Sequence, residues 1–493
     1  MPPGRHGGAD DGMGALIAVA PVVAVILLIA SGRVGVLPAG LIGWGLAALA
    51  AAALLPASHP APHFVILESL RGAWVAFQAI AVIVAGMFFY QVLRRQEAAL
   101  FDAETQATFS HRQLWAACFL LGPFAESATG FGVGAIIALA ALLRMGLTGT
   151  PVAILALYSQ MLVPWGALAI GTLISAKLAN VPEGPLAFAS ACLSVPLLAG
   201  YLVFYWRLAA AAGHPVHRQQ RWDDVIWTGL LAVVLVAASA VLAPEVDVIA
   251  AAGGLLLLRW LRDERPDAAA LKRTVIVSAP YAALTVALIA TRTIPPVGNT
   301  LRSVLVLAPF PDLAGFPILY NPSFWLVLVA VGVTCAAGRA RELPQLVSET
   351  MVGSWRPVVV TLAFVVMAQL LAEAGGAQLV GDALRAALGG AALLAAPAMG
   401  AGAGFLTGSI TAAAGMMMPA LVSLGTGVPL WPLALQNVAA GNFTLFSPVR
   451  VSKIVALAQL PGGDAEIYRA AWPIGAMLLG LLIAQAAVLL ALG

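Results

Sequence analysis

The chain has 493 residues, of which 61% are hydrophobic and 10% are charged, and its formal net charge is +3. An ordinary soluble domain carries roughly 25% charged residues. This composition therefore excludes a soluble globular protein and indicates an integral membrane protein. The chain has no long basic or acidic tract, which argues against nucleic acid as a partner.

Apolar runs long enough to cross a bilayer recur along the whole chain. We predict twelve spanning helices, near 13–31, 34–55, 73–93, 150–175, 185–207, 225–243, 246–260, 274–290, 323–338, 355–374, 429–455 and 472–492. Two further apolar stretches, 113–143 and 391–424, are interrupted by Gly, Ser and Thr residues. We interpret each as a re-entrant hairpin that enters and leaves on the same side of the membrane. The expected fold class is an all-α polytopic membrane protein.

The two hairpin stretches belong to an internal repeat with an offset of 278 residues. For example, Thr129-Gly130 recurs as Thr407-Gly408. Matches between Ala or Leu residues count for little in so apolar a chain, but matched Gln, Thr-Gly and Pro residues are harder to ascribe to chance. In a membrane protein such a repeat is typical of a transporter whose site lies between two related halves.

The Lys and Arg residues indicate an orientation in the membrane. With the N-terminus outside, 19 of the 25 fall on the cytoplasmic side, in keeping with the positive charge of cytoplasmic loops. Both termini are then expected outside. Span 73–93 and its repeat counterpart, 355–374, would cross in opposite directions. The repeats are therefore predicted to be inverted, an arrangement that supports alternating access around a midplane site.

The predicted organisation has four parts. Residues 1–72 form N-terminal helices, and 73–207 form the first inverted repeat with its hairpin. Residues 208–350 belong to neither repeat, and 351–493 form the second inverted repeat. We interpret 208–350 as a connecting scaffold that stays fixed or forms a homodimer.

The first hairpin contains the sharpest candidate residue. Its segment 122–132, GPFAESATGFG, would break the helix and leave backbone N–H groups that bind an anion; the alternative is a glycine-rich packing seam. The candidate substrate-binding residues here are Ser127, Thr129, Gly130, Phe131 and Gly132. Glu126 lies well inside the apolar core, where ionisable groups are costly and usually functional. We interpret Glu126 as the carrier of a coupling proton; the alternative is a structural partner for Arg450, Lys453 or a backbone turn.

The second repeat supplies a matching set of polar residues. Segment 400–415 repeats the hairpin pattern, and span 429–455 keeps a polar strip that a lipid-facing helix would not need. The remaining candidate substrate-binding residues are Gln160, Thr407, Gly408, Ser409, Thr411, Asn437, Asn442 and Arg450. Arg450 offers a planar fork suited to a carboxylate. Arg450 and Lys453 would serve equally well as anchors at the cytoplasmic interface.

Both hairpins resemble those of the L-lactate permease family. The sequence FAESATGFGVG, which begins at Phe124, is similar to the FLEGAAGFGTP pattern of that family. The sequence GFLTGSIT, which begins at Gly404, is similar to its GFxTGSNT pattern, and AAGN at 439–442 matches a later motif. The similarity in spacing extends over roughly 70–205 and 345–490.

The resemblance implies a secondary transporter of the bacterial inner membrane that imports small 2-hydroxymonocarboxylates, such as lactate or glycolate, by proton symport. It also implies an elevator motion. The chain departs from the family pattern at Ser127, Val133-Gly134, Ile410 and Ser447-Pro448. These departures lie in the expected binding region, so the anion is open.

Two alternatives keep the fold: sodium coupling, and a sulfonate or larger carboxylate as the cargo. An enzyme would need a cluster of His, Asp or Cys at membrane depth, and a proton-channel subunit would need a chain of Lys, Glu and His. The sequence shows neither pattern. We therefore expect no enzymatic activity, no cofactor and no metal site.

Overall fold

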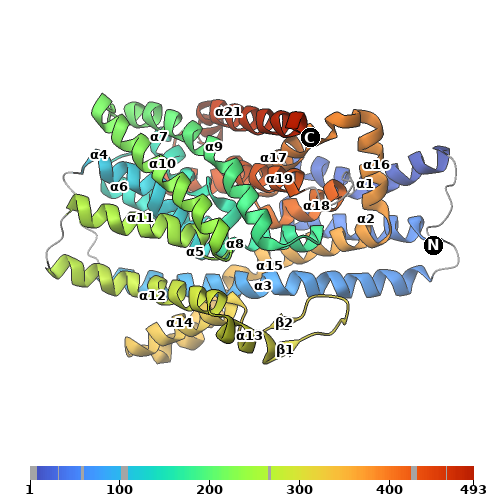
Figure 1. Cartoon of the computed structure of the whole chain (residues 1–493), viewed down its shortest axis with the longest axis horizontal. Helices are drawn as coiled ribbons and strands as arrows, with labels where there is room; N and C mark the ends of the chain where they lie inside the picture. Colours follow the sequence, from blue (N-terminus) through green and yellow to red (C-terminus); the bar gives the residue numbers. More distant parts are fainter. Residues whose placement is uncertain are drawn as a thin grey trace.

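The computed structural model describes residues 8–31, 33–56, 60–100, 109–130, 132–264, 268–422, 430–461 and 463–492. Most of these residues are helical, and many of the longer helices lie along one common direction (Figure 1). Among them, six helices are long and apolar enough to cross a membrane, or up to eight if each of two bent pairs forms one span. The fold is therefore compatible with a multi-pass helical membrane protein. The count of twelve spans stays a prediction.

The chain begins with α1 (Gly8–Ala30), α2 (Val36–Leu54) and α3 (Ala61–Leu100). Helix α3 starts well before the predicted span 73–93, so the predicted boundary at residue 72 lies inside a helix. Hydropathy misses the first turns of α3 because they carry polar side chains. Glu68 in this part is buried, pairs with Arg71 at 3.1 Å and accepts a hydrogen bond from Gln369 Nε2 at 2.9 Å.

The first predicted hairpin consists of two helical arms packed against each other. The first arm comprises α4 (His111–Ala116), the π-helical turn η1 (Ala117–Leu121) and α5 (Gly122–Thr129), and the second arm is α6 (Val133–Arg144). Gly130 and Gly132 in the turn have φ angles of 74° and 78°, which glycine adopts without steric cost. A broken helix follows, formed by α7 (Thr150–Leu157), η2 (Tyr158–Gln160), η3 (Val163–Trp165) and α8 (Gly166–Ala179), with a bend of 51°.

The same order of elements recurs in the second half. It comprises α15 (Leu343–Glu373), α16 (Gly376–Leu388), η5 (Gly389–Leu394), the hairpin arms α17 (Ala395–Thr407) and α18 (Ile410–Val422), and a broken helix formed by α19 (Leu430–Phe443), η6 (Thr444–Phe446) and α20 (Pro448–Ala458). Details match as well. Thr129 Oγ1 donates to the Ala125 carbonyl at 2.6 Å, and Thr407 Oγ1 donates to the Ala403 carbonyl at 2.8 Å. Gly408, like its counterpart, has a positive φ of 62°.

Helices α3 and α15 occupy equivalent places in the two halves and pack along each other (Figure 1). The early part of α3 meets the late part of α15, where Glu68 contacts Gln369. The late part of α3 meets the start of α15, where Arg95 pairs with Glu342 at 3.0 Å and with Glu349 at 2.6 Å. The two helices therefore run in opposite directions.

The remaining elements are α9 (Glu183–Ala211), α10 (Arg218–Val241), α11 (Asp247–Glu264), α12 (Ala268–Thr293), α13 (Pro295–Ser303), β1 (Val306–Leu307), β2 (Phe316–Pro317), α14 (Pro322–Ala336), η4 (Ala340–Glu342) and α21 (Gly463–Leu492). The short antiparallel pair β1–β2 is the one departure from helix among these elements, and the fold is consistent with the all-α expectation. Strands of two residues are too short to give a periodic signal.

The predicted boundaries at 207 and 350 lie inside α9 and α15, because these helices continue past their apolar runs.

Glycines allow the second hairpin to pack closely on α19. A Cβ atom at Gly404 would lie 2.1 Å from the carbonyl oxygen of Ala440, and one at Gly400 would lie 2.4 Å from that of Gln436. Gly402, on the same helix, would have no atom within 4 Å of its Cβ. Gly400 and Gly404 thus lie on the face of α17 that packs closely on α19, and Gly402 lies on another face.

Replacing Gly404 by alanine is expected to destabilise the folded protein by about 1–3 kcal/mol, the usual cost of overpacking a core. The clash is with helix backbone, which cannot rotate away as a side chain can. Thermal unfolding of the purified protein in detergent measures the effect. Gly402→Ala is the matched control and should unfold at the same temperature as the wild-type protein. Equal unfolding temperatures for the two variants would contradict the observed packing.

Candidate functional site

A cavity of about 630 Å³ lies between the turns of the two hairpins. Its wall includes Glu126 and Gly130 of the first hairpin, Gly166 and Ala167 of α8, Thr407, Gly408, Ser409 and Thr411 of the second hairpin, and Arg450 and Lys453 of α20. The rest comes mainly from the start of α2, at 35–38, and from α15, at 355–361. The cavity therefore combines residues from both halves of the chain.

Glu126 lies at the turn of the first hairpin and is only 2% exposed. Its Oε1 accepts a hydrogen bond from the backbone N–H of Gly132, and its Oε2 accepts one from Gly134, both at 3.0 Å. These N–H groups belong to the N-terminal end of α6, where the helix dipole favours a negative charge. In this conformation Glu126 therefore uses the donors that we expected to bind a substrate at the first turn.

Arg450 connects the two hairpins with the first broken helix. Its Nη1 lies 3.2 Å from Glu126 Oε1 and also donates to Gln160 Oε1. Its Nε donates to the carbonyl oxygen of Gly408 at 3.3 Å. The side chain is 12% exposed. The structure thus brings together Glu126 and Arg450, the partner that the alternative interpretation of Glu126 named.

The charged side chains that line the cavity are Arg356, Arg450, Lys453 and Glu126. Three cations and one carboxylate leave a formal excess of two positive charges, which favours a small anion. Ser409 and Thr411 at the start of α18 add hydroxyl groups near a helix N-terminus. Sequence analysis missed Arg356 as a site residue, because no local motif marks it and it reaches the cavity from α15.

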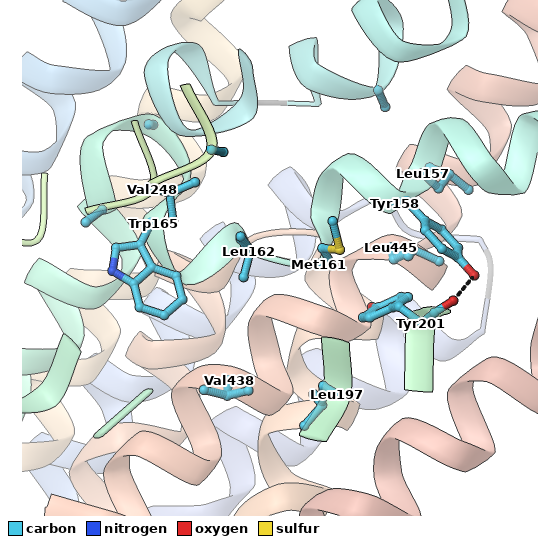
Figure 2. Packing of buried hydrophobic residues seen from close by; sticks show 14 of the residues in the cluster. Leu157, Tyr158, Met161, Leu162, Trp165, Leu197, Tyr201, Val248, Val438 and Leu445 are labelled. Carbon is cyan, nitrogen blue, oxygen red and sulfur yellow. Dashed lines mark hydrogen bonds between the residues drawn. The ribbon is translucent and has the colours of Figure 1, made fainter. Parts of the chain in front are cut away.

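Other predicted site residues lie away from the cavity wall. Asn437 is fully buried and donates to Thr172 Oγ1 at 2.9 Å and to Ser190 Oγ at 3.1 Å. Asn442 accepts a hydrogen bond from the hydroxyl of Tyr201 at 2.9 Å; Tyr201 and its neighbour Tyr158 are seen in Figure 2. These polar groups link α19 of the second broken helix to α8 of the first and to α9, since buried polar atoms need partners.

Four more predicted residues support the site without lining it. Ser127 and Thr129 donate to carbonyl groups of their own helix, at 2.8 and 2.6 Å. Gly132 contacts Glu126, and Gln160 contacts Arg450. Phe131 lies outside the described residues.

No protein-family model matches the chain, and no curated protein matches it. The two hairpin motifs and the AAGN segment nevertheless have identifiable structural places. Within AAGN, the carbonyl of Ala440 contacts the second hairpin at Gly404, and a Cβ atom at Gly441 would lie 2.7 Å from Cδ of Pro164. The small residues of this segment therefore allow three helical elements to meet behind the cavity.

Ser409→Cys, in a variant whose Cys118, Cys192 and Cys335 are replaced by alanine, is expected to react with a small membrane-impermeant thiol reagent. Ser409 lines the cavity and is partly exposed, whereas a cysteine at the fully buried Asn437 should not react. Labelling in vesicles of opposite orientation then measures the side of the membrane to which the cavity opens. Equal labelling at both positions would contradict the cavity.

Proposed function

We propose that the protein is a secondary active transporter that imports a small monocarboxylate, of the lactate or glycolate type, together with a proton across the bacterial inner membrane. The observation that carries this proposal is the position of Arg450. Its guanidinium contacts the buried carboxylate of Glu126, and both side chains line a cavity with excess positive charge. The family resemblance of the two hairpins supports the same substrate class.

Coupling follows from competition between two carboxylates for one arginine. In the present geometry Nη1 of Arg450 pairs with Glu126. A substrate carboxylate that enters the cavity would need the same planar donors. Protonation of Glu126 removes its negative charge and releases Arg450 for the substrate. Proton binding and anion binding therefore favour each other, and this reciprocal linkage is what symport requires.

The proposed motion divides the helices into two groups. The hairpins and broken helices form the moving group, in which α17 packs on α19 and α18 packs on α8. Helices α2, α3 and α15 form the fixed group together with α12 and α14 of the segment 208–350, which also mediates any homodimer, whereas α11 packs on the first hairpin and moves with it. The cavity lies between the groups, because 35–38 and 355–361 face the hairpin turns across it. Twelve spans and two inverted repeats complete the proposed elevator.

Uptake of labelled L-lactate into proteoliposomes tests this function. An inward proton gradient at fixed sodium concentration should drive accumulation, and a protonophore or protein-free liposomes should show none. Glycolate should compete with L-lactate better than a sulfonate of similar size. Accumulation that needs a sodium gradient at fixed pH would overturn proton coupling, and uptake of a sulfonate alone would overturn the substrate class.

A further inference from the structure

Asp247 is a second deeply buried carboxyl group, and the coupling scheme above does not use it. It is the first residue of α11, and its side chain is fully buried. Its Oδ2 accepts hydrogen bonds from Trp165 Nε1 at 3.0 Å and from Ser239 Oγ at 2.7 Å. Among the residues that the structure describes, no group forms a hydrogen bond with its Oδ1.

The surroundings of Asp247 do not compensate a negative charge. A buried carboxylate is stable when a cation or several donors offset the lost hydration, and within the described part of the chain no basic side chain forms an ion pair with it. The nearby acidic group is Glu245, which is paired with Arg292 at 3.0 Å and repels a second carboxylate. The N-terminus of α11 favours the charged form, but only through partial charges.

We infer that Asp247 is a proton-binding site, with the proton on Oδ1 and with Oδ2 as the carbonyl oxygen that accepts both hydrogen bonds. The donors around it favour a proton over a metal cation. Trp165 and Ser239 direct hydrogen atoms at Oδ2, whereas a site for a hard cation would direct several oxygen atoms inward. The inference does not rest on which substrate is carried.

Trp165 links this proton site to the cavity. It is the last residue of η3, in the short segment that separates α7 from α8 in the first broken helix (Figure 2). The next residue, Gly166, lines the cavity, and a Cβ atom there would lie 3.8 Å from Cγ of Glu126. Asp247 therefore holds one wall of the cavity in place from α11. A neutral carboxyl group does so without adding a second negative charge near an anion site.

Infrared spectroscopy of the full-length protein in lipid at neutral pH tests the protonation state, through the C=O stretch of a protonated carboxylic acid. Asp247→Asn is expected to remove one such band. Ser239→Ala is expected to move that band to higher frequency, because the carbonyl loses one hydrogen bond. Ser194→Ala is the matched control, since Ser194 is a buried serine that donates to the Ser190 carbonyl instead.

An unchanged carboxylic-acid spectrum in Ser239→Ala and in Asp247→Asn would show that Asp247 is ionised, and would overturn the inference. If Asp247→Asn fails to fold, the frequency in Ser239→Ala decides alone. The measurement needs no transport and no substrate. Its result is therefore independent of the result of the L-lactate uptake experiment.

Discussion

Arg450→Gln is expected to weaken L-lactate binding roughly 10- to 150-fold and to abolish gradient-driven uptake. The substitution removes the planar cation proposed for the substrate carboxylate, and charge-assisted hydrogen bonds contribute about 1.5–3 kcal/mol. It also removes the cation that pairs with the buried Glu126 at 3.2 Å, and breaking a buried ion pair in this way costs about 3–5 kcal/mol of stability. Calorimetric titration with L-lactate and thermal unfolding of the purified variant measure the two effects separately.

Three further variants separate binding from folding. Arg450→Lys keeps the charge but loses the fork, so its affinity should fall while its stability is largely retained. The double variant Glu126→Gln/Arg450→Gln should unfold at a higher temperature than Arg450→Gln alone, because no unpaired charge stays buried. Arg385→Gln is the control, since this α16 side chain is 44% exposed. Wild-type L-lactate affinity in Arg450→Gln would contradict the proposed role.

Glu126→Gln is expected to uncouple transport from the proton gradient. An amide cannot change its charge, so Arg450 is no longer withheld from the substrate at high pH. Exchange of external for internal L-lactate should persist, whereas accumulation driven by a proton gradient should be lost. The amide also places an NH₂ group against the N–H of Gly132 or Gly134, at a cost of about 1–3 kcal/mol for the unsatisfied donor. Counterflow and gradient-driven uptake in the same proteoliposomes measure the difference.

The control for this prediction is Glu264→Gln. Glu264 lies at the end of α11, is exposed and accepts a hydrogen bond from Gln113 at 2.7 Å, away from the cavity between the hairpins. Both modes of transport should keep wild-type rates in this variant. If Glu126→Gln still accumulates L-lactate at the wild-type level under a proton gradient, a residue other than Glu126 carries the coupling proton.

Much of the hairpin architecture could be predicted from the sequence. Gly, Ser and Thr residues interrupt two apolar runs at the same spacing, and the turn glycines Gly130 and Gly408 both adopt positive φ. An apolar run shows only the part of a helix that resembles a bilayer span, however. The beginnings of α3 and α15 were therefore missed, since each carries polar side chains that pair with the far end of the other helix. Glu68 accepts a hydrogen bond from Gln369, and Glu349 pairs with Arg95.

The interior of the site was less predictable, because tertiary packing decides it. Glu126 was selected as a candidate because of its charge within an apolar run, but its hydrogen bonds to Gly132 and Gly134 depend on how the chain reverses. Asn437 was found as part of a polar strip, yet it contacts α8 and α9. Asp247 stands at the edge of an apolar run, and its full burial comes from elements distant in sequence.

The proton taken up when L-lactate binds tests the central claim most directly. Calorimetric titration of the purified protein in buffers of different ionisation enthalpy, at a pH where Glu126 is ionised, measures that proton count. If substrate and Glu126 compete for Arg450, wild-type protein takes up a proton as L-lactate binds and Glu126→Gln does not. Binding of L-lactate without proton uptake, or with equal uptake in the variant, would contradict the account.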